Sequence, residues 1–371
     1  MSQDSHESTA VRAFSPWKWI AWTAAILIGL WIATTAVHRH RMEKIRTEVE
    51  SRGGRLEGND FYPDWYDWLL TKAPNGWPKE TVLKLKGNFQ RVVSVRLPPG
   101  VTPPHDLISR LAIFPRLEEL VLRDCHLTDA DLEGLSKLTA LKLLALDGNP
   151  VSDRGLADLD KLVVLEYVYL HGTRAGDEVL RDASRIPKLD YLDLTNTDAT
   201  DAGLSDLGSC PKLSTLMLDN TRVSDSGIAS LAPQPSLLCF SLGGCSITDR
   251  GLGTIDDDHF PTLGVLNLEK TQVTADGVAR LRLNRLGALI ISNLPLADEH
   301  WRELARMKAL FFVQWGEKLL GRESGRSSTG RSFVLDSFIQ ADGMGLFGPT
   351  ISPSRPIRER YPQSPAPESL E

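Results

Sequence analysis

Leucine recurs along this chain in a short pattern, L-x-x-L-x-L, in which mostly polar residues separate the apolar ones. The first leucine of the pattern stands at positions 117, 141, 165, 189, 213, 237, 263 and 286. Five successive spacings are 24 residues, the next is 26 because DDDHF lengthens one connection, and the last is 23. A nearly fixed period of this length predicts a solenoid, in which each repeat forms one coil stacked on its neighbours.

Each repeat carries the signals for a strand, a turn and a helix, in that order. Segments such as LEELVL (117–122) and LSTLML (213–218) predict short strands with one buried side. Ser or Thr followed by Asp comes next and predicts a helix start, because these side chains accept hydrogen bonds from free amides there. The pairs are Thr128-Asp129, Ser152-Asp153, Thr200-Asp201, Ser224-Asp225 and Thr248-Asp249. Apolar residues three apart, such as Leu204 and Leu207, predict the buried face of each helix.

Two columns of small residues run through the repeats. The first column is expected to hydrogen-bond the backbone of the neighbouring coil, and it contains Cys125, Asn149, Thr173, Thr197, Thr221, Cys245 and Thr271. The second is a column of glycines just before the first helical leucine, where close approach of the neighbouring coil explains the glycine better than phosphate binding does. Two segments, 175–183 and 273–281, depart from the pattern, so looser helix caps are expected there.

The combined phrase LxxLxLxx(N/T/C)x(V/L/I)(T/S)DxGLxxL resembles the leucine-rich repeat family. It is similar in particular to the bacterial membrane-anchored members and to the cysteine-containing repeats of substrate adaptors. The match covers about Phe114 to Met307. It implies an α/β solenoid with a parallel sheet on the concave face and helices on the convex face. The resemblance is specific for the fold and weakly specific for the function.

An uncharged apolar run near the start predicts one N-terminal transmembrane helix, residues 19–37. The run WIAWTAAILIGLWIATTAV is 19 residues long, close to the roughly 20 that cross a bilayer as a helix. A cleaved signal peptide is the alternative, but the run is long for one and the basic HRHRMEKIR follows directly. Two basic residues precede the run and six follow it closely, which predicts a single-pass membrane protein with a cytoplasmic repeat domain.

The remaining segments complete a linear domain plan. We expect an N-terminal tail at 1–18, the transmembrane helix at 19–37, a juxtamembrane stalk at 38–60, an N-terminal cap region at 61–113, the solenoid with its C-terminal cap at 114–315, and a disordered tail at 316–371. The aromatic stretch 61–80 is interpreted as a cap over the first coil, with a ligand site as the alternative. The tail is rich in Ser, Pro, Gly and Arg, a composition that cannot bury a core.

Side chains between the buried leucines of each strand project onto the concave face, the usual ligand surface of a solenoid. The candidate binding residues there are Tyr167, Tyr169, His171, Tyr191, Asp193, Asp147 and Asp219. Tyrosines surrounded by acids are typical of a binding site for a basic protein partner. The alternative is that tyrosine suits a half-exposed sheet.

Composition excludes several function classes. The net charge of −6 argues against a nucleic-acid partner, which needs a concentrated basic surface. The four cysteines form no CxxC pair, and no Cys/His group has zinc-ligand spacing. DDDH (256–259) is read as a solvated turn, with a cation site as the alternative.

No catalytic motif appears, and the sequence predicts no catalytic residue, metal ligand or cofactor. GRSSTG (325–330) lacks the strand-turn-helix setting that activates a serine. The leading hypothesis is a non-catalytic, membrane-tethered protein that recruits or senses another protein. The alternative is a structural, envelope-organising protein that binds itself or cell-wall material.

Overall fold

The structure, a computed structural model, describes residues 37–60, 90–208, 210–292, 294–315, 318–322 and 338–340. The chain divides into two compact units, one formed by Met1–Glu48 with Asp60–Gln90 and the other by Val49–Asn59 with Arg91–Glu371. In the first unit, residues 37–48 are helical, and this helix runs on to residue 51. The second unit contains all of the leucine repeats.

The strands form one sheet in which spatial order follows chain order. They are β1 (Arg55–Asp60), β2 (Gln90–Arg96), β3 (Glu119–Val121), β4 (Leu143–Ala145), β5 (Tyr167–Tyr169), β6 (Tyr191–Asp193), β7 (Thr215–Met217), β8 (Cys239–Ser241), β9 (Val265–Leu268), β10 (Ala288–Ile291), β11 (Phe312–Trp315), β12 (Lys318–Arg322) and β13 (Phe338–Gln340). From β2 to β11 neighbouring strands are parallel, whereas β12 and β13 join by antiparallel pairing. The predicted α/β solenoid with a parallel sheet is confirmed.

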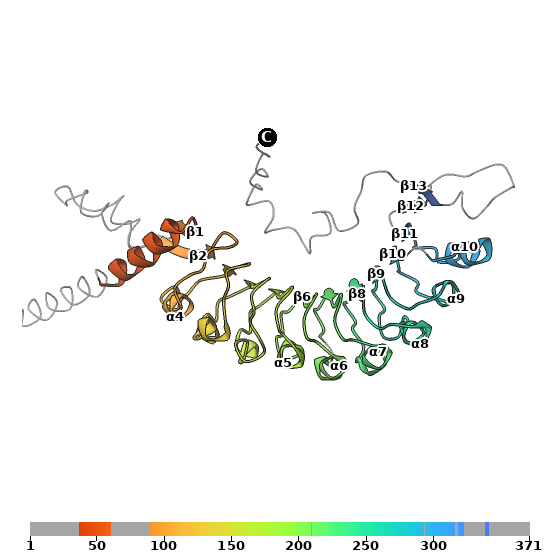
Figure 1. Ribbon diagram of the computed structural model, residues 1–371, viewed down its shortest axis with the longest axis horizontal. Helices are drawn as coiled ribbons and strands as arrows, with labels where there is room; N and C mark the ends of the chain where they lie inside the picture. The colour runs from red at the N-terminus through yellow and green to blue at the C-terminus, as the bar shows by residue number, and fades with distance from the viewer. Residues whose placement is uncertain are drawn as a thin grey trace, which may run out of the picture. The chain divides into compact units, whose positions relative to one another are not determined.

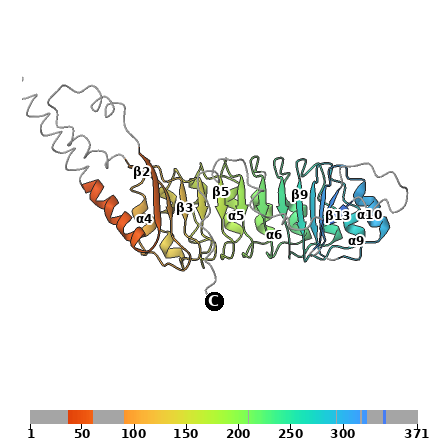
Figure 2. The same cartoon turned by 90° about the horizontal axis from the view of Figure 1, so that it is seen from above.

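Within the repeat unit the strands line one side of the coils and the helices line the other (Figures 1 and 2). The helices are α4 (Leu107–Leu111), α5 (Asp177–Ala183), α6 (Asp201–Leu207), α7 (Asp225–Ser230), α8 (Asp249–Leu252), α9 (Ala275–Ala279) and α10 (Asp298–Ala305), with 3₁₀ helices η2 (Asp129–Leu132), η3 (Leu135–Lys137) and η4 (Leu159–Lys161). Leucines from both sides fill the space between them. Leu120, Leu144 and Leu192 on the strands, and Leu204 on α6, are all fully buried.

The helix starts follow the prediction in most coils. Thr200, Ser224 and Thr248 are the N-caps of α6, α7 and α8, and each hydroxyl accepts a hydrogen bond from an amide of the first turn. The helix expected after Ser152 is wrong, because residues 153–158 form turns and only η4 follows. Asp158 has a φ of +68°, which a right-handed helix cannot contain, so the chain cannot continue helically there.

The column of small residues divides into two kinds. Asn149 reaches the preceding coil as expected, because its Oδ1 accepts from the amides of Cys125 and Leu127 at 3.0 and 2.9 Å. Thr173 instead donates to the carbonyl of Leu170 in its own coil at 2.7 Å, and the other threonines of the column donate in the same way. The threonines therefore close their own turns, in contrast to the prediction.

The aspartates at the helix starts link successive coils. Ser152 donates from its amide and its hydroxyl to the two carboxylate oxygens of Asp129, each at 2.7 Å. The same pair of bonds joins Thr200 to Asp177, Ser224 to Asp201, Thr248 to Asp225 and Thr274 to Asp249. The expectation that each carboxylate caps its own helix is thus corrected, since these carboxylates bind the capping residue of the next coil.

The glycine column is the steric counterpart of these aspartates. A Cβ added to Gly203 would lie 2.6 Å from Leu180 Cδ1 and 3.0 Å from Asp177 Cα. Close approach of the preceding coil is therefore the reason for glycine here, as predicted.

One of the two irregular repeats retains this link between coils, and the other replaces it. In the first, Gly176 replaces the capping hydroxyl of α5, yet Asp177 still binds Thr200. In the second, Ala275 replaces the aspartate, and the neighbouring Asp276 lies 3.0 Å from His300 Nε2 in the next coil. The missing link is thus replaced by a different pair of side chains.

The array continues beyond the last leucine repeat through β11. The Trp315 ring packs edge-on against Trp301 with ring centroids 6.0 Å apart, and Trp315 Nε1 donates to the carbonyl of Leu294 at 2.8 Å. Residues 318–322 and 338–340, within the segment predicted to be disordered, are strands β12 and β13. The rest of that segment and the aromatic stretch 61–80 lie outside the described residues.

The predicted membrane helix falls on residues 19–37, of which only Val37 is described. A helix occupies residues 37–51, and a turn follows it at Arg52 and Gly53, where Gly53 has a φ of +77°. Within the described parts of the chain, no helix is both long and apolar enough to span a bilayer.

Candidate functional site on the strand face

The strand register brings most of the predicted binding residues onto neighbouring coils. Tyr167 of β5 is the register partner of Tyr191 of β6, and Tyr169 is the partner of Asp193. Asp147 lies just beyond β4, where its Oδ1 accepts from the His171 amide at 3.1 Å. The sheet therefore gathers the tyrosines of two coils beside the acids of the flanking coils.

The three tyrosines are not equally available. The rings of Tyr169 and Tyr191 pack together with centroids 4.7 Å apart and planes inclined by 33°. Both are partly exposed, whereas Tyr167 is only 6% exposed. Burial raises the pKa of the Tyr169 and Tyr191 hydroxyls. The surface that a partner can reach is thus the Tyr169–Tyr191 pair.

Tyr167 instead lines a shallow open hollow at the starts of the strands. The hollow has a volume of about 360 Å³ and is bordered by Glu166, Tyr167, Lys188, Asp190, Pro211, Lys212 and Ser236. Its charges are mixed, and apart from Tyr167 its lining residues are not among the predicted binding residues.

Arg123 is a member of the site that the sequence analysis missed. Its Nε lies 2.6 Å from Asp147 Oδ2, and its guanidinium carbon lies 5.1 Å from the centroid of the Tyr169 ring. Burial raises the pKa of Asp147, and the charge of Arg123 opposes that rise. A signal was present, because Arg123 stands one repeat before Asp147 in the same concave column. The negative charge of Asp147 is therefore already compensated by the chain.

Asp193 and Asp219 carry negative charge that, unlike the charge of Asp147, is not offset by a basic side chain among the described residues. Among the described residues neither forms an ion pair with a basic side chain, and Asp193 Oδ1 accepts only from the Thr195 amide at 2.9 Å. The two acids are close enough for the charge of Asp193 to add to the effect of burial in raising the pKa of Asp219. Uncompensated negative charge on this face is thus concentrated on β6 and the coil after it.

A polar network that holds Asp219 in place was also not predicted from the sequence. Asp219 Oδ1 accepts from Ser241 Oγ at 2.7 Å, from the Gly243 amide at 3.0 Å and from Asn267 Nδ2 at 2.8 Å. Ser241 and Asn267 are themselves buried on the strands that follow. Three donors on one oxygen hold the carboxylate in place, while Asp219 Oδ2 is buried and makes no hydrogen bond.

His171 lies at the rim of the site. It is exposed, and its Nε2 lies 3.5 Å from Asn196 Nδ2 of the next coil. This is a long contact, so the imidazole is held only weakly.

The described residues offer little for covalent or metal chemistry. Within them, no group of three His, Cys, Asp or Glu side chains is arranged to hold a metal ion. The four cysteines are free thiols in buried positions, and burial raises the pKa of Cys239 to about 12 and that of Cys210 to about 11. Thiols of this kind stay protonated at neutral pH and are poor nucleophiles.

Comparison with known proteins gives no functional assignment. No protein-family model matches the chain, and no curated protein matches it either. Two similar solved structures are the internalins InlF and InlC2 of Listeria monocytogenes. InlF is 18% identical over 57% of this chain and 70% of its own, and InlC2 is 23% identical over 51% and 84%, each with a TM-score of 0.38. Likeness at this level carries no argument about function.

Proposed function

We propose that this chain is a non-catalytic repeat protein, tethered to a membrane through residues 19–37, whose concave face binds a basic segment of another protein. The observation that carries the proposal is the packed Tyr169–Tyr191 pair beside Asp193 and Asp219, two acids without a basic partner in the described chain.

The aromatic pair supplies the apolar part of such a site. Partly exposed tyrosines held by packing lose little conformational freedom when a partner binds, and aromatic side chains are enriched among the residues that dominate binding energy. The pair lies on a rigid sheet rather than on a loop, so its geometry is set before binding.

The acids supply the preference for positive charge. Because Arg123 pairs with Asp147, this preference falls on Asp193 and Asp219. Charges at the edge of such a site speed association with an oppositely charged partner and make binding sensitive to salt.

The membrane tether rests on the uncharged run and on the basic residues after it. The helix at residues 37–51 begins at the last residue of that run. The excess of Lys and Arg after the run favours a cytoplasmic repeat domain. Protease added outside intact cells should then leave the repeats uncut, and their rapid digestion would reverse this orientation.

The test of the binding site uses the full chain in a neutral detergent and a fluorescent peptide of alternating Lys, Arg and Gly. Fluorescence polarisation measures the affinity. We expect Tyr169→Ala with Tyr191→Ala to weaken binding at least about thirtyfold, the equivalent of one aromatic anchor of about 2 kcal/mol. We expect Asp193→Asn with Asp219→Asn to weaken binding and to reduce its dependence on salt. Tyr167 is left intact because truncating a buried ring would disturb the fold.

A matched control removes the same charge elsewhere. Glu133→Gln with Glu299→Gln neutralises two exposed acids, one after η2 and one on α10 of the helical side, and should leave the affinity unchanged. An equal loss in the control, or no binding of the peptide by the wild-type chain, would contradict the proposal.

A further inference from the structure

We infer that the concave face recognises an arginine of its partner, rather than basic charge in general, and that this arginine lies against Tyr191 between Asp193 and Asp219. The inference rests on the proposed function and adds the identity of the side chain that binds. It is drawn from the way in which the chain uses one of its own arginines on the same surface.

Arg123 shows how this face accommodates a guanidinium. The group lies 5.1 Å from the centroid of the Tyr169 ring and its Nε is 2.6 Å from a carboxylate oxygen of Asp147. Arginine thus gains contact with an aromatic ring and with a partly buried acid together. A planar, weakly hydrated guanidinium suits both contacts, whereas a compact ammonium keeps its hydration shell.

The same two components recur farther along the array. Tyr191 is the next ring of the stack, 4.7 Å from Tyr169, and Asp193 follows it on the same face of β6. Tyr191 pairs in register with Thr215 of β7, whose side chain is much smaller than a tyrosine ring. Among the described residues, however, no basic side chain forms an ion pair with Asp193 or Asp219.

Asp219 adds a second negative charge, and the chain holds its carboxylate in place. Its Oδ1 already accepts three hydrogen bonds, whereas its buried Oδ2 accepts none. Because Oδ2 is enclosed by the chain, Asp219 acts on a partner through its charge, and Asp193 is the acid to which a partner can donate a hydrogen bond. Guanidinium has several N–H groups in one plane, so it can donate to Asp193 and stack on Tyr191 while its charge lies near Asp219, which a compact ammonium does less well.

The experiment compares three peptides that differ at one position. Each is a fluorescent Gly/Ser peptide with a single central Arg, Lys or citrulline, titrated with the full chain in neutral detergent. We expect the Arg peptide to bind at least about tenfold more tightly than the Lys peptide, and the uncharged citrulline peptide to bind most weakly. In Tyr191→Leu the preference for Arg over Lys should fall to about twofold or less, because the ring is lost while the acids remain.

The comparison with the wild-type chain requires no variant to fold. Equal affinity for the Arg and Lys peptides overturns the inference while leaving the proposed basic partner in place. Binding of neither peptide, together with no binding of the alternating Lys/Arg/Gly peptide, overturns both. A preference for Arg that survives in a folded Tyr191→Leu chain places the arginine elsewhere and also overturns the inference. Glu133→Gln with Glu299→Gln is the charge control and should keep the full preference.

Discussion

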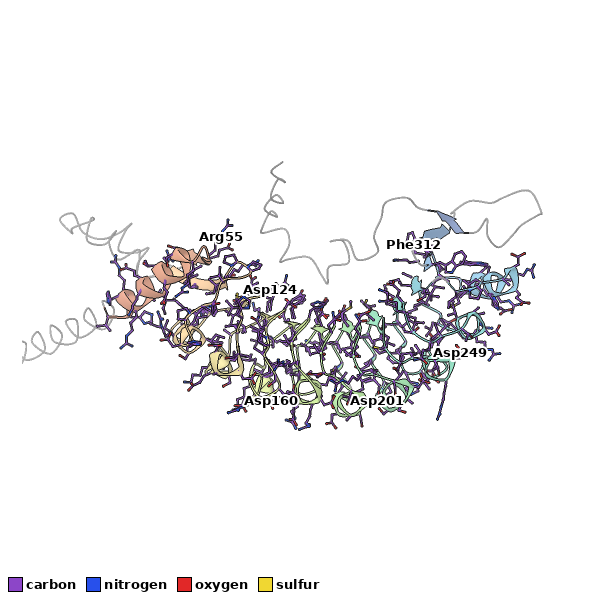
Figure 3. The ribbon with its side chains drawn as sticks, in the orientation of Figure 1. Arg55, Asp124, Asp160, Asp201, Asp249 and Phe312 are labelled. Carbon is purple, nitrogen blue, oxygen red and sulfur yellow. The ribbon has the colours of Figure 1, made fainter. Side chains whose placement is uncertain are left out.

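Asp201 belongs to the first turn of α6, yet both of its carboxylate oxygens accept hydrogen bonds from Ser224, the capping residue of α7. The Ser224 amide lies 2.7 Å from Oδ1 and the Ser224 hydroxyl lies 2.5 Å from Oδ2. Ser224 also accepts from the amide of Ser226 and so begins its own helix. One helix start thus positions the next, and repetition of this pair links the helical side of the array, where Asp201 and Asp249 lie (Figure 3).

These carboxylates should therefore matter more for stability than exposed acids. We expect Asp201→Ala to lower the free energy of unfolding by about 1–3 kcal/mol, because the Ser224 amide and hydroxyl lose charged acceptors. Urea denaturation followed by circular dichroism measures the loss. Asp198→Ala is the control, since Asp198 pairs with Arg222 at an exposed site and should cost at most about 1 kcal/mol. Equal losses in the two variants would show that the hydrogen bonds between coils stabilise the fold no more than an exposed ion pair does.

The glycines that face these aspartates give a steric test. We expect Gly203→Ala to lower the free energy of unfolding by about 1–3 kcal/mol, because the new methyl group would overlap Asp177 and Leu180. Gly253→Ala should be neutral or stabilise by about 0.5–1 kcal/mol, because Gly253 has a φ of −66° and its nearest neighbours would lie 3.4 Å away. A stable Gly203→Ala variant would remove close approach as the reason for the glycine column.

The charge on Asp219 should oppose folding at neutral pH. Burial raises its pKa above that of the unfolded chain, so its contribution to stability is full below the unfolded pKa of about 3.9 and is lost as the pH rises through the folded value. Asp219→Asn keeps an oxygen that can accept from Ser241 and Asn267 but carries no charge. We expect the variant to be more stable than the wild-type chain at pH 7, with the difference shrinking toward zero near about pH 4.

Urea denaturation at several pH values checks this expectation. A variant that is less stable than the wild-type chain at pH 7 would mean that the ionised carboxylate is needed to hold the polar network. The ionised Asp219 carboxylate would then lower the stability of the fold while it attracts the proposed basic partner.

The proposed membrane tether can be tested independently of the repeats. The full chain should sediment with membranes and stay there in alkaline carbonate, because a run of 19 uncharged residues inserts as a helix. A chain that begins at Arg55 should remain in the soluble fraction. Release of the intact full-length chain by carbonate would contradict the anchor.

The sequence alone determined the architecture of the repeat array. The period near 24 residues determines how the coils stack, and the alternation within each strand determines which side chains are buried. The register partners on the concave face therefore follow from the sequence. This succeeds because apolar burial is roughly additive and is repeated in every coil. Tyr169, Tyr191, Asp193 and Asp219 were placed on one face in this way.

The tertiary structure decided which polar groups meet. Sequence could not show that Asp201 binds the next coil, that Arg123 crosses two coils to lie over Tyr169, or that Asn267 reaches Asp219 from 48 residues away. These contacts depend on side-chain rotamers and on the distance between coils, and neither produces a repeated pattern in the sequence. The burial of Tyr167 has the same origin, because how closely neighbouring side chains pack over a ring depends on their shapes and not on the period.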